Sequence, residues 1–441
     1  MTEREAAVGA RRAARFAGVR WAALAFFVAL AVRLIAIWVV GPVQLEFGDA
    51  HDFLETSRIV CTQEEYPATG NLTFFRAPGY PLFVSLVTAC HPDRILRVKV
   101  CNALVDSLTV VLIWVLAGQM VRSAAGQLLA SAVAAFHPIF VVQTTDVRSE
   151  SIFMFLVTGA LVALFAARTA RPRWLLLAGA LLGLAALTRP AALVAIPFFA
   201  VAWVIGSSSG QRRAAVASAV LLVAAAAAVV GPWSIYISER HHELIFVNDA
   251  GGYNLWRGTH PDLISALNSP DRRTYQDQSQ RFELVTSPSE AVAVSREADS
   301  PMGRSRAWRL RAQERIASDP IGFVAALGGN LWRLWRPWLN PLGYPNATVL
   351  ASAAFLLPML FLGTLGLSGL RSAQPWLFGF VACWFLVVSL SHIPFQAVMR
   401  FRMPFTDPIL IALMWGGLTA LRASFSRGTQ RPASDGRAMS A

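Results

Sequence analysis

The chain has 441 residues, of which 55% are hydrophobic and only 15% are charged. Ordinary globular proteins carry about 25% charged residues, so this composition excludes a soluble enzyme, a disordered protein, a collagen and a coiled coil. It leaves a polytopic membrane protein. The four cysteines are too few for a disulfide scaffold and lack the spacing of metal ligands.

Apolar runs long enough to cross a bilayer recur along the chain. A span needs about 20 apolar residues in a helix. Two shorter runs, 174–187 and 191–205, flank Thr188-Arg189-Pro190, and a proline beside a charged residue favours a break between two helices. The sequence therefore predicts an all-α membrane protein with about ten transmembrane helices. The longer runs are 21–40, 100–120, 124–142, 151–167, 214–233, 348–367, 375–390 and 404–421.

The formal net charge of +13 indicates how the chain is oriented in the membrane. With the N-terminus inside, the predicted cytoplasmic segments hold 16 basic and three acidic residues, and the rest of the chain holds 23 of each. The excess thus lies on one side, as the positive-inside rule requires, and nucleic-acid binding is not needed to explain it. We predict a basic cytoplasmic tail at 1–20, a membrane domain at 21–422 and a second cytoplasmic tail at 423–441.

Two long segments face outward in this topology. The first, 41–99, contains the apolar stretch 78–89, which is too short to span and is predicted to form an interfacial or re-entrant helix. The second, 237–346, holds 25 of the 65 charged residues, so it is solvated; loops of this length are usually functional or disordered. Tryptophan and arginine alternate at 331–338. An interfacial aromatic belt and a groove for a lipid or sugar are the two interpretations.

Carboxylates and arginines gather near the predicted outer surface. A carboxylate can act as a general base toward a hydroxyl, and guanidinium groups can bind a phosphate and stabilise the charge on it as it leaves. Each residue alone could equally form an interfacial salt bridge, but the set predicts sugar transfer from a lipid phosphate. Its members are Asp49, Asp52, Arg76, Glu150, Arg189, Arg257, Arg400 and Arg402.

Four short motifs occur in order along the chain, and in them the sequence resembles the GT-C glycosyltransferases that use polyprenyl-phosphate sugars. Within this class it is most similar to the bacterial dolichyl-phosphate-mannose-protein mannosyltransferase-like proteins, and it also resembles the aminoarabinose transferases of lipid A. Phe53 stands where the family has tyrosine. The motifs are Gly48-Asp49-Ala50-His51-Asp52-Phe53, Arg76-Ala77-Pro78-Gly79-Tyr80-Pro81-Leu82-Phe83, Ser149-Glu150 and Gly183-Leu184-Ala185-Ala186-Leu187-Thr188-Arg189-Pro190.

The resemblance implies roles for individual residues. Asp49 would be the catalytic carboxylate, Glu150 the second acidic position, and Arg76 a contact of the donor phosphate. We add Arg189, Arg400 and Arg402 to the predicted phosphate site. The remaining predicted substrate-binding residues are Asp52, Tyr80, Trp256 and Arg257.

No metal ligand is carried over from the family. Phe74 and Phe75 occupy the place where some relatives have a metal-ligating acid. A divalent cation stays open as an alternative, because carboxylates and histidines can hold one. The residues concerned are Asp49, His51 and Asp52 with one of His241, His242 and His260.

These observations predict an inverting glycosyltransferase that moves a sugar from a polyprenyl-phosphate donor to an acceptor hydroxyl, with Asp49 as base. The reaction would occur on the periplasmic face of a bacterial inner membrane, and the acceptor could be a glycan, a lipid or a protein. The alternatives are a transporter or lipid flippase, which would place polar residues near the bilayer midplane, and a noncatalytic subunit. Two further pairings stay open: Cys61 with Cys90, and Arg33 with Asp106, which could instead face the site.

Overall fold

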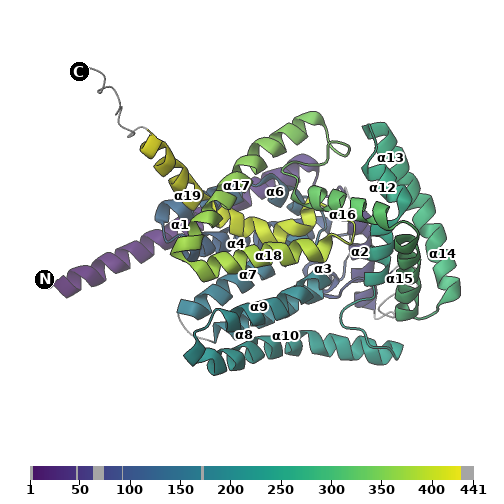
Figure 1. Cartoon of the computed structure of the whole chain (residues 1–441), viewed down its shortest axis with the longest axis horizontal. Helices are drawn as coiled ribbons and strands as arrows, with labels where there is room; N and C mark the ends of the chain where they lie inside the picture. Colours follow the sequence, from purple (N-terminus) through teal and green to yellow (C-terminus); the bar gives the residue numbers. More distant parts are fainter. Residues whose placement is uncertain (1–2, 46–47, 63–73, 92, 170–172, 429–441) are drawn as a thin grey trace, which may run out of the picture.

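The computed structural model describes residues 3–45, 48–62, 74–91, 93–169 and 173–428. Most of these residues form helices, and no strand occurs among them. Long helices lie side by side in the larger part of the molecule, and a layer of shorter helices covers one end (Figure 1). This arrangement confirms the predicted all-helical class.

The first half of the chain supplies most of the long helices. Helix α1 already begins at Glu3, so it includes most of the segment predicted as the N-terminal tail. The elements are α1 (Glu3–Val40), α2 (Gly48–Thr62), α3 (Gly79–Thr88), α4 (Ile95–Met120), α5 (Ala124–Ala135), α6 (Pro138–Thr144), α7 (Glu150–Thr169), α8 (Trp174–Thr188), η1 (Pro190–Val194), α9 (Ala195–Ile205), η2 (Ser209–Gln211) and α10 (Arg212–His241).

The second half first forms the helices α11 to α15, which we call the covering layer, and then returns to the bundle. The elements are α11 (Gly251–Thr259), α12 (Pro261–Leu267), α13 (Arg272–Arg281), the π-helical turn η3 (Phe282–Thr286), α14 (Ser287–Glu297), α15 (Pro301–Ser318), α16 (Pro320–Trp335), α17 (Asn346–Ala373), α18 (Pro375–His392) and α19 (Met399–Gly428).

Seven helices of the described chain are long and apolar enough to cross a membrane, and an eighth span arises if the bent pair α5–α6 is counted as one. The pair bends by 48° next to Pro138, where the proline ring removes a helical hydrogen bond. The apolar helices α8 and 190–205 are shorter than a full span. The protein is therefore an integral membrane protein, and the count of ten spans stays a prediction.

Small residues let the long helices approach closely. Gly179 and Gly183 lie one turn apart on α8 and face α10. A Cβ atom at Gly179 would lie 2.1 Å from the carbonyl oxygen of Leu222, and one at Gly183 would lie 2.9 Å from that of Ala226. Close backbone approach through small residues is a usual way for helices to associate in membranes.

A buried ion pair joins α1 to α4. Arg33 and Asp106 are both fully buried, and a guanidinium nitrogen lies 2.5 Å from the Asp106 carboxylate. Arg33 also donates to the carbonyl oxygens of Ala134 and Ala135 at the C-terminal end of α5. The structure therefore pairs Arg33 and Asp106 with each other, and they do not join the carboxylates and arginines that were predicted to form the site.

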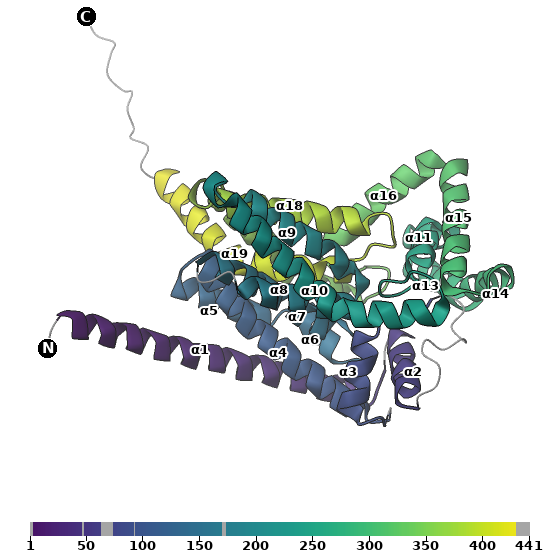
Figure 2. The ribbon, with the colours of Figure 1, turned by 90° about the horizontal axis from the view of Figure 1, so that it is seen from below.

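The long segment 237–346 is folded into helices. Its core consists of aromatic side chains from α11, η3 and α15, chiefly Tyr253, Trp256, Phe282 and Trp308. Ser300 and Asp319 cap α15 and α16 by accepting backbone N–H bonds, and a proline follows each of them at the first helical position. Figure 2 shows this layer beside α2 and α3 at one end of the bundle.

Candidate functional site

The first carboxylate of the site lies in the first turn of α2. Asp49 accepts a hydrogen bond of 2.9 Å from Arg76, which precedes α3, and one of 3.1 Å from Arg400 in the first turn of α19. Arg76 also donates to Asp52 at 2.6 Å. Three segments that are far apart in the sequence therefore meet at Asp49.

The second carboxylate is Glu150, the first residue of α7. Its side chain is 4% exposed, and Arg189 forms an ion pair of 2.8 Å with it. Arg400 lies 3.9 Å from Glu150 as well as 3.1 Å from Asp49. Arg400 thus links the two carboxylates into one ion-pair network.

Aromatic rings cover the guanidinium groups of this network. Arg76 lies 5.0 Å above the ring of Phe53 and 5.2 Å above that of Phe74. Phe401 lies under both Arg189, at 5.6 Å, and Arg400, at 5.2 Å. Cation–π contacts of this kind hold a guanidinium group in one orientation. They give a physical reason for the aromatic residues near Arg76 and beside Arg400.

Gly79 brings the segments of Arg76 and Arg189 together. A Cβ atom at Gly79 would lie 2.9 Å from the backbone of both Leu187 and Thr188, so only glycine fits there without a shift. Arg189 itself is extended (φ −146°, ψ 118°), because a following proline disfavours the helical conformation. The Pro-Gly-Tyr and Thr-Arg-Pro motifs therefore form one structural unit.

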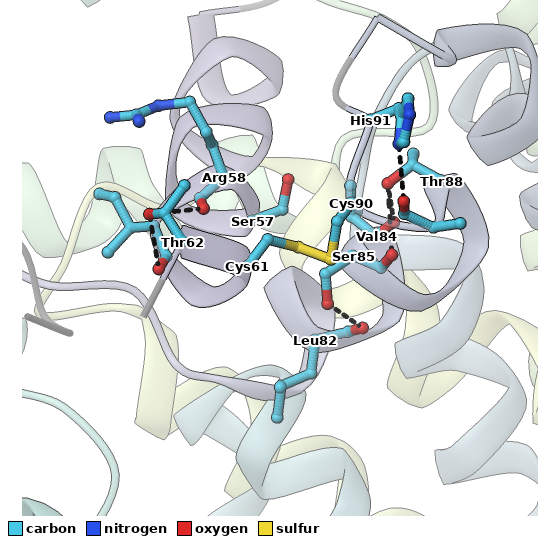
Figure 3. Close-up of a disulfide and its surroundings, with 12 residues drawn as sticks. Ser57, Arg58, Cys61, Thr62, Leu82, Val84, Ser85, Thr88, Cys90 and His91 are labelled. Carbon is cyan, nitrogen blue, oxygen red and sulfur yellow. Dashed lines mark hydrogen bonds between the residues drawn. A yellow bond between two sulfur atoms is a disulfide. The ribbon is translucent and has the colours of Figure 1, made fainter. Parts of the chain in front are cut away.

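A disulfide between Cys61 and Cys90 joins the C-terminal end of α2 to the residue pair that follows α3 (Figure 3). Ala89 and Cys90 both have positive φ, which turns the chain sharply after α3. The bridge ties together the two short helices whose N-terminal ends bear on the ion-pair network. It resolves the pairing that the sequence left open.

Electrostatic interactions within the network favour the ionised states of Asp49 and Arg76. Burial alone would raise the pKa of Asp49, but the charges of Arg76 and Arg400 hold that pKa well below its usual range. Burial alone would lower the pKa of Arg76, and its carboxylate neighbours raise it instead. The Asp49 side chain remains 34% exposed, so a substrate can reach it.

Several supporting residues escaped the sequence analysis. Asn102 on α4 donates to the hydroxyl of Tyr80 at 2.9 Å and to the carbonyl oxygen of Arg148 at 3.3 Å, so it fixes the turn that leads to Glu150. Asp249 accepts a hydrogen bond of 2.9 Å from the backbone N–H of Phe75, the residue before Arg76. A polar residue in an otherwise apolar span was a usable signal for Asn102, and nothing in the local pattern marks Asp249.

Four predicted site residues lie outside the network. Arg402 is fully buried and pairs with Asp407, which is also buried. Tyr80 is buried under Phe53. Trp256 belongs to the aromatic core of the covering layer.

The fourth of these, Arg257, joins that layer to the segment before α19. It donates to Gln396 at 2.6 Å and pairs with Glu283 on η3. Arg257 thus holds the covering layer against the chain that leads to Arg400. These contacts indicate a structural role, and in the described part of the chain Arg257 forms no ion pair with a carboxylate of the network.

No group of three histidine, cysteine, aspartate or glutamate side chains in the described chain is placed to hold a metal ion. Of the histidines considered from the sequence, His241 stacks on Phe75, and His260 accepts a hydrogen bond from the backbone of Asp262 within the covering layer.

Residues 76–236, about a third of the chain, match the model of the family described as dolichyl-phosphate-mannose-protein mannosyltransferase. The matched region begins at Arg76 and contains Glu150 and Arg189. No curated protein matches the chain. The predicted resemblance to this class of glycosyltransferases is thereby confirmed for the middle of the chain.

Solved structures share the fold. The archaeal oligosaccharyltransferase AglB from Archaeoglobus fulgidus, in complex with an inhibitory peptide and a dolichol-phosphate, aligns with a TM-score of 0.55 at 12% identity, over 97% of this chain and 53% of that one. The apo form of the Archaeoglobus fulgidus oligosaccharyltransferase gives 0.55 at 13% identity, over 96% and 53%. This chain therefore spans about half the length of these enzymes and has a GT-C-like fold. ArnT from Cupriavidus metallidurans bound to undecaprenyl phosphate aligns with a TM-score of 0.41 at 15% identity, over 94% and 81% of the two chains.

Proposed function

We propose that the protein is a membrane glycosyltransferase that moves a sugar from a polyprenyl-phosphate donor to an acceptor hydroxyl. The ion-pair network carries this proposal, because three arginines and three carboxylates converge at the covered end of the bundle. The match to the mannosyltransferase family over 76–236 supports the reaction class. The dolichol-phosphate in the structure of AglB, which shares the fold, supports a polyprenyl-phosphate donor.

In the proposed reaction Asp49 accepts the proton of the acceptor hydroxyl. The hydroxyl oxygen bonds to C1 of the sugar while the bond from C1 to the phosphate oxygen breaks, and the electron pair leaves with the polyprenyl phosphate. Attack from the side opposite the phosphate inverts the anomeric centre. Arg76, Arg189 and Arg400 stabilise the charge of the leaving phosphate.

Asp49 suits the role of base better than Glu150. The Asp49 side chain is 34% exposed, whereas that of Glu150 is 4% exposed and is held by Arg189. In our proposal Glu150 orients Arg189 and Arg400 toward the phosphate. Asp52, which shares Arg76 with Asp49 and is half-exposed, lies where it can contact the acceptor or the sugar.

Donor binding activates Asp49 in this scheme. The charges of Arg76 and Arg400 lower the pKa of Asp49 and so make it a weak base. A donor phosphate competes for the same N–H donors, which weakens their bonds to Asp49 and raises its pKa toward the usual value. The carboxylate thus gains basicity only when a donor is present.

We place the site on the periplasmic face of a bacterial inner membrane, with both termini in the cytoplasm. The positive-inside distribution supports this orientation. The disulfide between Cys61 and Cys90 lies on α2 and α3, beside the network, and disulfides persist in oxidising compartments. The acceptor could be a glycan, a lipid or a protein hydroxyl, and a divalent cation could assist donor binding.

The test is sugar transfer in lipid nanodiscs, with a panel of labelled polyprenyl-phosphate sugars and crude cell envelope as acceptor. Asp49→Asn should lower turnover by about 10²–10⁴-fold, the usual contribution of a general base. Glu55→Gln is the matched control, because Glu55 lies on the same helix, is exposed and pairs with Arg58; it should keep the wild-type rate.

Wild-type turnover in the Asp49→Asn variant would refute the assignment of the base. If no donor of the panel binds to the wild-type protein, the transferase proposal fails. The transporter or flippase alternative would then be tested by measuring substrate movement across liposomes.

A further inference from the structure

A pocket of about 330 Å³ lies between the C-terminal half of α16 and the segment that follows α12. One wall carries Asn268 and Ser269, and the other carries Trp332, Arg333 and Arg336. In Figure 2, α16 is at the upper edge of the molecule, whereas α2 and α3 are at the lower edge. None of the pocket residues belongs to the ion-pair network.

The pocket holds two arginines that have no carboxylate partner in the described part of the chain. Arg333 donates to Asn268 at 3.4 Å and to Asn330 at 2.9 Å, and its Nε has no hydrogen-bond partner among the described residues. Arg336 donates to the carbonyl oxygen of Trp338 at 3.1 Å and to Asn340 at 3.5 Å. All four acceptors are neutral, so no carboxylate of the described residues balances the two positive charges that face the pocket.

The two guanidinium groups also destabilise each other. Burial lowers the pKa of Arg333 and that of Arg336, and the charge of Arg333 lowers the pKa of Arg336 further. An anion between them would relieve this repulsion. Phosphate suits the position, because planar guanidinium groups bind its oxygens bidentately.

An exposed apolar stripe leads along α16 to the same pocket. Ile321 is 83% exposed, Val324 65%, Leu331 44% and Trp332 55%. At 100° per residue these four positions share one face of the helix. A free phosphate would leave this apolar surface uncovered, whereas the acyl chains of a lipid can pack against it. An amphipathic helix with this pattern lies in the membrane interface.

We propose that this pocket binds the phosphate headgroup of an anionic membrane lipid, whose chains lie along the apolar face of α16. In this proposal the residues 331–338 form part of a lipid groove. It does not depend on the proposed glycosyl transfer. Asn330, a partner of Arg333, also donates to the carbonyl oxygens of Ile393 and Phe395, so the lipid site adjoins the segment that leads to Arg400.

The experiment uses the full-length protein in detergent and native mass spectrometry to titrate the first bound phosphatidylglycerol. Ser269→Asp places a carboxylate in the pocket, where it competes with the headgroup, and Ser269→Asn is the matched neutral control. Because the new carboxylate occupies the place of the headgroup phosphate, the first phosphatidylglycerol should bind about tenfold more weakly to Ser269→Asp than to Ser269→Asn. A change of this size is expected when charge-assisted hydrogen bonds are lost.

A second pair of variants tests the arginines directly. The double variant Arg333→Gln, Arg336→Gln should weaken binding at least tenfold. The double variant Arg306→Gln, Arg309→Gln removes the same charge from exposed positions on α15 and should bind like the wild type. Equal affinity in both double variants, or in both Ser269 variants, would overturn the proposal.

Three further ligands identify the source of the phosphate. Phosphatidylcholine that binds as tightly as phosphatidylglycerol, or inorganic phosphate that displaces the lipid at equal concentration, would overturn the proposed anionic lipid. Undecaprenyl phosphate is the third ligand. Binding that is weaker in Ser269→Asp than in Ser269→Asn supports the pocket for phosphomonoester lipids too, because the Ser269 comparison isolates this pocket from the proposed donor site.

Discussion

Asp249 offers a quantitative test of how the segment of Arg76 is held. It is 2% exposed, one oxygen accepts the N–H of Phe75 at 2.9 Å, and the other has no partner in the described chain. Burial raises the pKa of Asp249 to about 7 from an ordinary 3.8, although the hydrogen bond from the Phe75 N–H opposes the change. The residue therefore remains a neutral acid in the folded protein at mildly acidic pH.

The magnitude follows from linkage. Between pH 3.8 and about 7 the unfolded chain has released this proton and the folded chain retains it, so the free energy of unfolding falls as the pH rises through this window. Each pH unit corresponds to about 1.4 kcal/mol, which gives a loss of up to about 4 kcal/mol by pH 8. Asp249→Asn keeps an acceptor for Phe75 and cannot ionise, so it should remove this loss.

The assay is thermal unfolding of the purified protein in detergent from pH 4.5 to pH 8. The Tm of Asp249→Asn should nearly equal that of the wild type at the acidic end and exceed it by several degrees at pH 8. Asp277→Asn, at an exposed position on α13, is the control and should differ from the wild type by a constant amount. A gap that does not widen with pH, or a variant less stable than the wild type at pH 8, would refute the reasoning.

Three further variants test the assembly of the site. Gly79→Ala should lower the free energy of unfolding by about 1–3 kcal/mol in chemical denaturation, because its Cβ meets backbone at 2.9 Å; an unchanged midpoint would contradict this close contact. Arg189→Gln leaves Glu150 buried without its nearest partner and should cost about 3–5 kcal/mol. Adding Glu150→Gln should recover part of this loss, and strictly additive losses would argue against the pair. Replacing Cys61 and Cys90 by serine should cost about 3–4 kcal/mol for a loop of this length, whereas equal stability of the oxidised and reduced wild type would show that the bridge contributes nothing.

The sequence by itself determined the class of protein and most of its helices. Apolar runs, prolines and charge asymmetry are local features, because each helix satisfies its own backbone and must bury or expose its own side chains. For this reason the break at Pro190 and the helix after Pro78 were predictable. The bend at Pro138 was not predicted, and the single run 124–142 became the two helices α5 and α6.

The candidate site was only partly predictable. Its motifs named Asp49, Arg76, Glu150 and Arg189, and the structure brings these residues together. It also separates Arg400 from Arg402: the first bridges two carboxylates, and the second is buried with Asp407. Two residues of one helical turn point in different directions, so sequence proximity could not tell them apart.

Only the tertiary structure decided how the segment 237–346 behaves and what covers the site. The helices α11 to α15 are stabilised by the shared aromatic core around Trp256 and Trp308, a set of contacts between residues far apart in the chain. The same holds for Asp249 at Phe75, the Cys61–Cys90 bridge and the two arginines of the α16 pocket. Long-range contacts of this kind depend on how helices pack, and a pattern read along one segment cannot contain them.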